Sequence, residues 1–179
     1  MTRELGWVQL IVLTFARTTE LRAARWSEIE NLDESEPLWR IPADRMKMRR
    51  EHIVPLSPQA VAALRELRSL PGSAVSPFLF PSPSREGHMS NNTMLYALYR
   101  MGYHRRATIH GFRAMASTAL NEMGFRSDVI ERQLAHQEQN SVRAAYNRAE
   151  YLAERRAMMN YWADRLDAMA GNIVTFKSA

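Results

Sequence analysis

The sequence predicts one mainly α-helical domain that also carries a small antiparallel β-sheet, an α+β fold. The chain has 179 residues, of which 46% are hydrophobic, and this is enough for one well-packed core. All eight prolines lie at or before Pro83, so the second half can form helices without interruption. Two short β-type runs, at 38–41 and 52–56, flank a proline and a basic segment, which is typical of a hairpin.

The first half should alternate helices with turns. Residues 4–16 are apolar enough for a core helix, and the threonines that follow can cap a second helix ending near Arg25. Ser57 followed by proline is a helix-start pattern, and this third helix should end before Gly72. We expect a short buried strand over 78–81 and a surface loop after it.

The second half should be almost entirely helical. Gly102 and Gly124 are the expected stop signals. The helices that the spacing predicts cover residues 91–101, 109–123, 127–135, 140–146 and 150–169. The last of them has a wide apolar stripe, which favours packing against a core or a partner.

Composition excludes several kinds of chemistry. The chain has no cysteine, which excludes disulfides, thiolate metal sites and cysteine nucleophiles. Lysine and arginine outnumber aspartate and glutamate by 24 to 19, and the net charge of +5 suits a polyanionic partner without proving one. The apolar run at 8–16 is too short to span a bilayer. The glycines do not cluster into a phosphate-binding loop, and the histidines lack metal-ligand spacing.

The residues most informative about function lie between His110 and Tyr146. His110 and Arg113 are three positions apart, so on a helix they share a face and could approach one phosphate. Arginine suits this task because its planar fork donates to two oxygens and stays charged. His136 and Tyr146 come from later elements, and a phenol can attack phosphorus once its proton is removed. Each residue alone is better explained by packing or a surface position.

The order of these residues along the whole chain changes that interpretation. Arg17 near a helix start and Lys47 on the hairpin precede the His-x-x-Arg pair, the later histidine and the tyrosine. In this order the chain resembles the tyrosine recombinases, and most closely the phage-type integrases. The resemblance covers nearly the whole chain and is carried by residues 13–22, 46–56 and 145–148.

The resemblance implies site-specific DNA cleavage and religation through a 3′-phosphotyrosyl intermediate, with no metal and no cofactor. The implied catalytic residues are Arg17, Lys47, His110, Arg113, His136 and Tyr146. The two arginines would clamp the scissile phosphate while the tyrosine attacks it. His110 would manage the proton of the nucleophile, and Lys47 is the candidate acid for the leaving 5′-oxygen. His136 would bond a phosphate oxygen or orient the site.

The chain departs from the family pattern at three points. Ala16 and Ala135 stand where glycine commonly precedes the first arginine and the second histidine. The step from His136 to Tyr146 is one residue longer than in many relatives. This leaves Tyr151 as the second candidate for the nucleophile.

The resemblance also predicts the context of the domain. Residues 1–179 would form one catalytic domain of the integrase fold, a fragment without the N-terminal DNA-clamping region, and 150–179 would pack on a neighbouring protomer. The full enzyme would form a tetramer on double-stranded attachment sites of a phage or other mobile element, in the bacterial cytoplasm on the nucleoid, and the isolated chain would be a monomer. Candidate contacts to flanking phosphates are Arg45, Arg49, Arg50, Arg105 and Arg106. Two alternatives stay open: DNA relaxation of the type IB topoisomerase kind, and a non-catalytic DNA-binding module.

Overall fold

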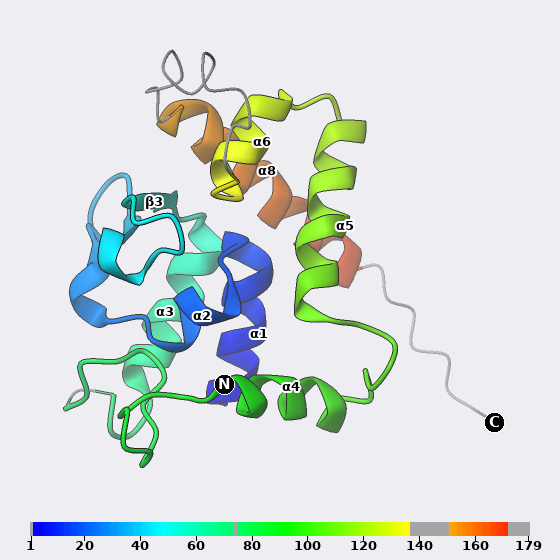
Figure 1. Cartoon of the computed structure of the whole chain (residues 1–179). Coiled ribbons are helices and arrows are strands. Elements are labelled where there is room, and N and C mark those ends of the chain that lie inside the picture. Colours follow the sequence, from blue (N-terminus) through cyan, green and yellow to red (C-terminus); the bar gives the residue numbers. More distant parts are fainter. Residues whose placement is uncertain (1, 74, 137–150, 172–179) are drawn as a thin grey trace.

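The computed structural model describes residues 2–73, 75–136 and 151–171, and it confirms the α+β class (Figure 1). The helices are α1 (Arg3–Thr14), α2 (Thr18–Arg22), α3 (Pro58–Ser69), α4 (Asn91–Arg100), α5 (Ile109–Glu122), α6 (Ser127–Gln133) and α8 (Leu152–Gly171). The strands are β1 (Ile29–Glu30), β2 (Leu38–Ile41) and β3 (His52–Pro55). Within the described parts of the chain, no helix is both long and apolar enough to cross a membrane.

The sheet is antiparallel, in the order β1-β2-β3. The predicted hairpin is confirmed, with Trp39 opposite Val54 in its register. β1 was not expected, because two residues are too short to show an alternating pattern. The prediction of a strand at 78–81 is wrong: this segment makes only isolated bridges, from Phe78 to Arg25 and from Pro81 to His88. Prolines within and beside it lack the N–H groups that a ladder needs.

One hydrophobic core lies between α1, α3 and the sheet. Trp7 and Leu10 of α1 are buried at helical spacing, and they belong to the same cluster as Leu64 and Leu67 of α3 and Trp39 of β2. Figure 1 shows α1, in dark blue, near the middle of the molecule, with α3 beside it. This core fixes the position of α1, and so the position of Phe15 and Arg17, which follow it in the sequence.

A second core is formed by α5, α6 and α8. Leu120, Ile130 and Trp162 are buried in it, and Phe15 reaches it from the end of α1. Phe15 has a left-handed backbone with φ of 57°, and its ring meets that of Trp162 at a centroid distance of 5.5 Å. This conformation is costly for a side chain with a Cβ, and burial of the ring offsets the cost. Because Phe15 ends α1, Arg17 lies at the boundary between the two cores.

Several helices end at the residues that the sequence predicts as stop signals. Gly102 and Gly124 follow α4 and α5 with φ of 83° and 85°, a conformation that favours glycine. Four ends differ from the sequence expectation by two residues or more: α1 ends at Thr14, α2 at Arg22, α6 at Gln133 and α8 at Gly171. The helix expected at 140–146 lies outside the described residues.

Candidate active site

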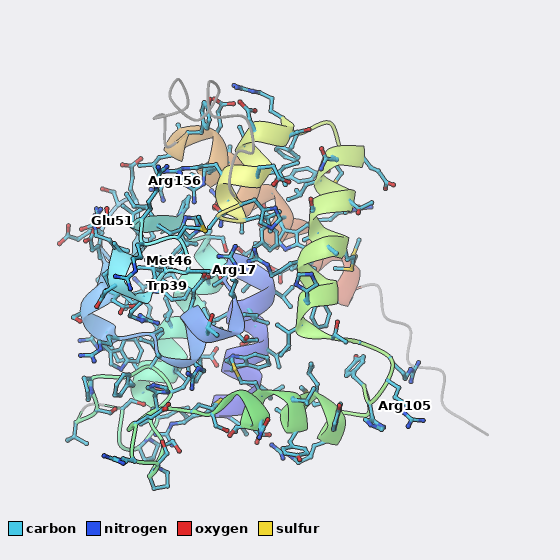
Figure 2. All side chains as sticks on the ribbon, viewed as in Figure 1. Arg17, Trp39, Met46, Glu51, Arg105 and Arg156 are labelled. Atoms are coloured by element: carbon cyan, nitrogen blue, oxygen red, sulfur yellow. The ribbon has the colours of Figure 1, made fainter. Side chains whose placement is uncertain are left out.

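The guanidinium groups of Arg17 and Arg113 meet at the end of α6. Arg17 Nη2 donates to the carbonyl oxygen of Ala135 over 3.0 Å, and Arg113 Nη2 donates to that of Leu134 over 2.7 Å. These carbonyls are consecutive, and the next residue is His136. Figure 2 shows Arg17 in the middle of the molecule, between the first helices and α5. Three of the six expected catalytic residues are therefore brought together from three separate elements.

Arg17 is held in place by a buried carboxylate. Glu20 is 2% exposed and accepts from the Arg17 backbone N over 2.6 Å and from its Nη1 over 2.8 Å. Arg17 is the N-cap of α2 and Glu20 stands three residues later, which is the capping-box position. A carboxylate that accepts both bonds fixes the start of α2 and the direction of the guanidinium together. Sequence reasoning missed Glu20, although its spacing from the helix start was a usable signal.

Arg113 reaches the site from α5 and is 7% exposed. Burial and, to a smaller extent, the nearby charge of Arg17 lower the pKa of its guanidinium, Glu20 and Glu131 oppose the shift, and the resulting pKa is about 10. A guanidinium with this pKa is still charged at neutral pH. Two cations held this close repel each other, and an anion placed between them would relieve that repulsion. The site is therefore built to attract a group such as phosphate.

His136 lies just after α6 and is oriented by Glu131 of that helix. Its Nδ1 donates to the Glu131 carboxylate over 2.6 Å, and its backbone N donates to the Glu131 carbonyl over 3.0 Å. The opposite ring nitrogen, Nε2, is then left for a ligand, and the side chain is exposed. Ala135, just before it, has φ of 49°. Glycine, which the family resemblance leads us to expect at this position, adopts positive φ without strain.

His110 lies in the first turn of α5, one turn before Arg113 on the same helix, and it is exposed. The helix start beside it is capped by Thr108, whose hydroxyl accepts from the Gly111 backbone N over 3.0 Å. Lys47 is exposed in the connection between β2 and β3. Both side chains are thus open to a ligand, on different elements from Arg17.

Arg45 has a different position from the one expected for a DNA contact. Its guanidinium donates to the Glu28 carboxylate and to the Glu20 carbonyl, and its side chain is 16% exposed. These contacts attach the β2–β3 connection, which carries Lys47, to α2. They favour a structural role for Arg45 over contact with a phosphate.

The other four candidates for phosphate contacts are exposed. Arg49 and Arg50 follow Lys47, and Arg105 and Arg106 lie in the loop between α4 and α5. Figure 2 shows Arg105 on that loop, well away from Arg17 in this view. Arg105 could therefore bind a backbone phosphate only at a distance from the arginine pair.

Tyr146 lies outside the described residues, whereas Tyr151 lies at the start of α8. The Tyr151 hydroxyl donates to the Asp128 carboxylate, and the Arg126 guanidinium lies 5.1 Å from the ring centroid. Asp128 is in the first turn of α6, and the arginine pair is at the other end of that helix. Tyr151 is therefore held at the opposite end of α6 from the arginine pair.

In the described parts of the chain, no three histidine, aspartate or glutamate side chains form a group that could hold a metal ion. The acidic groups nearest the site, Glu20 and Glu131, are each paired with a site residue. The local electrostatics therefore come from fixed cations and from the carboxylates that orient them.

A model of the phage integrase family matches residues 1–152. The chain belongs to this family. A prophage integrase IntA of Escherichia coli is 48% identical over 165 residues, covering 91% of this chain and 39% of that relative. The integrase of Enterobacteria phage P4 is 49% identical over 177 residues, covering 89% of this chain and 39% of that relative. This member of the phage integrase family thus spans well under half the length of these relatives.

Solved structures confirm the fold of the family. An integrase from mycobacterium phage Brujita superposes with a TM-score of 0.63 at 20% identity, covering 88% of this chain and 50% of that chain. A XerA recombinase superposes with a TM-score of 0.56 at 18% identity, covering 94% of this chain and 56% of that chain. The integrase catalytic-domain fold expected from the sequence is therefore confirmed.

Proposed function

We propose that this chain is the catalytic domain of a site-specific DNA recombinase, which integrates or excises a mobile element by cleaving and rejoining double-stranded DNA. The observation that supports it is the placement of Arg17 and Arg113 on consecutive carbonyls beside His136. A guanidinium has five N–H donors, more than the described contacts of either arginine use, so donors are left for phosphate oxygens. Membership of the phage integrase family supports the same function.

In the proposed reaction the phenol oxygen of Tyr146 attacks the phosphorus, and the bond from phosphorus to the 5′-oxygen breaks. The products are a 3′-phosphotyrosyl ester and a free 5′-hydroxyl. His110 takes the phenol proton, and Lys47 supplies a proton to the leaving oxygen. Arg17 and Arg113 neutralise the charge on the non-bridging oxygens, the role that a metal plays in other phosphoryl transfers. Attack by a second 5′-hydroxyl reverses the step, so no cofactor is consumed.

The proposal extends to the assembled enzyme. A tetramer would act on two DNA sites in the bacterial cytoplasm, on the nucleoid, with residues 150–179 packed on a neighbouring protomer, while the isolated chain is a monomer. The exposed side chains of Arg49, Arg50, Arg105 and Arg106 would bind flanking phosphates. Binding through such contacts weakens steeply as salt rises.

The decisive test is a nicked suicide DNA substrate incubated with the purified chain and resolved on a denaturing gel. The wild type should form a covalent protein–DNA adduct. Tyr146→Phe should form none, because it lacks the attacking oxygen, and the matched variant Tyr151→Phe should form as much as the wild type. An adduct that persists in Tyr146→Phe and is lost in Tyr151→Phe would reverse the assignment of the nucleophile.

The same preparation separates the rival functions. Exchange of strands between two marked duplexes is expected of a recombinase. Relaxation of a supercoiled plasmid without strand exchange would show topoisomerase chemistry instead. Binding of DNA with neither activity, and with no adduct from the wild type, would show a non-catalytic module.

A further inference from the structure

Arg155 in α8 is fully buried, with 0% of its surface exposed. It stands at i, with Met158, Met159 and Trp162 at i+3, i+4 and i+7, on the stripe that α8 turns to the second core. A guanidinium at such a position is costly unless its N–H groups have acceptors. The contacts that satisfy it therefore indicate what it does.

Those contacts connect four elements. Arg155 Nε donates to the Gln133 side-chain oxygen over 2.9 Å, and Arg155 Nη2 donates to the carbonyl oxygen of Ile53 in β3. Gln133 is also fully buried, and its Nε2 donates to the Thr14 carbonyl oxygen over 2.9 Å. One buried chain of hydrogen bonds thus joins α8 to α6, to β3 and to the end of α1.

The residues joined by these hydrogen bonds each lie close in sequence to a residue of the candidate site. Gln133 immediately precedes Leu134 and Ala135, whose carbonyls accept from the two arginines. Thr14 lies three residues before Arg17, at the end of α1. Ile53 is in β3, which follows the connection carrying Lys47. The elements that carry the site are therefore tied together by two buried side chains, those of Arg155 and Gln133.

We propose that Arg155 is a positioning residue, which fixes the end of α6 against α1 and β3 and so sets how the two arginines and His136 face the phosphate. This inference rests on the proposed function. Through its bond to Gln133, Arg155 also anchors the start of α8 to the end of α6. In the sequence, α8 follows the segment that contains Tyr146. Apolar contacts with the second core, through Met158, Met159 and Trp162, also hold α8 in place.

The test compares Arg155→Met with Arg165→Met, which removes an exposed arginine from the same helix. Methionine fills a similar volume but leaves the acceptors on Gln133 and Ile53 without their donor. Single-turnover cleavage at saturating DNA should slow by about 10²-fold in Arg155→Met, because a displacement of about 1 Å has that effect. DNA affinity should stay within about threefold, and Arg165→Met should match the wild type in both measurements.

Further variants distinguish a loss of positioning from a simple loss of folding. Gln133→Met removes the other end of the main contact and should slow cleavage as well. If the two residues act as a unit, the double variant should be no slower than the slower single variant. Arg155→Lys, which keeps the charge but reaches fewer acceptors, should recover part of the rate. Additive losses, or full activity in a folded Arg155→Met, would overturn the proposal.

A readout that needs no activity separates this inference from the proposed function. The amide of His136 donates to the Glu131 carbonyl, and its hydrogen exchange can be followed in folded protein. Exchange there should be faster in Arg155→Met than in Arg165→Met, even if the wild type cleaves no DNA. Unchanged exchange would show that Arg155 does not position this segment, whatever the function of the chain.

Discussion

His52 gives the sharpest prediction of stability. It begins β3 and is 4% exposed. The pKa of its imidazole is lowered from 6.5 to about 3, chiefly by burial and also by the charges of Arg155, Arg132 and Arg17, while a backbone hydrogen bond with Gln133 opposes the shift. The folded protein therefore holds this ring neutral across the range in which the unfolded chain would protonate it.

The sign and size of the effect follow from proton linkage. Between pH 6.5 and pH 3 the unfolded chain binds the extra proton, so the free energy of unfolding falls as the pH falls through this window. At full slope a single group changes this free energy by about 1.4 kcal/mol per pH unit. Because the unfolded ring is only partly protonated near pH 6.5, the loss between pH 7 and pH 5 is about 2 kcal/mol.

Urea unfolding followed by tryptophan fluorescence at pH 7, 6 and 5 measures this loss. The comparison is with His52→Leu, which cannot take up a proton, and the other titrating groups cancel in the difference between the two proteins. The variant should lose about 2 kcal/mol less than the wild type over this range. Equal pH dependence in both proteins would refute the reasoning, whatever the absolute stability of His52→Leu.

Two further predictions concern single contacts. Glu20→Ala removes the acceptor of two bonds from Arg17, so the free energy of unfolding should fall by about 2 kcal/mol. The control is Glu30→Ala, which removes a half-exposed carboxylate paired with Arg40 and should cost under about 1 kcal/mol in the same urea experiment. Leu120 is fully buried in the second core, so Leu120→Ala should leave a cavity there. It should lower the thermal midpoint by an amount equivalent to roughly 2–5 kcal/mol of unfolding free energy. Met115→Ala, on the exposed side of α5, should change the midpoint little. Similar losses at Leu120 and Met115 would contradict the assignment of the core face.

Much of the fold could be predicted because its signals are local. Proline and serine mark the start of α3, and Gly102 and Gly124 end α4 and α5 at positions where φ is positive. The hairpin follows from two short apolar runs. The early end of α1 at Phe15 could not be predicted, because the left-handed turn there depends on a ring packing against Trp162, far along the chain.

The candidate site, like the fold, has some features that could be predicted from the sequence and others that could not. The order of Arg17, His110 and Arg113 along the chain supported the resemblance to the tyrosine recombinases, and that resemblance implied the chemistry. Their partners are different: Glu131 orients His136 from five residues away, and Arg155 reads in the sequence as an ordinary charge on a helix. Only its place among apolar residues at helical spacing hinted that it is buried.

The sequence by itself determined which reactive groups the chain carries, in what order, and where most helices begin and end, because these depend on neighbouring residues. The tertiary structure decided that Arg17 and Arg113 meet on consecutive carbonyls before His136, and that Arg155 joins the elements beneath them. The physical reason is that these contacts join residues far apart in the chain. Their geometry is set by how the two cores pack against each other, and no local pattern encodes that packing.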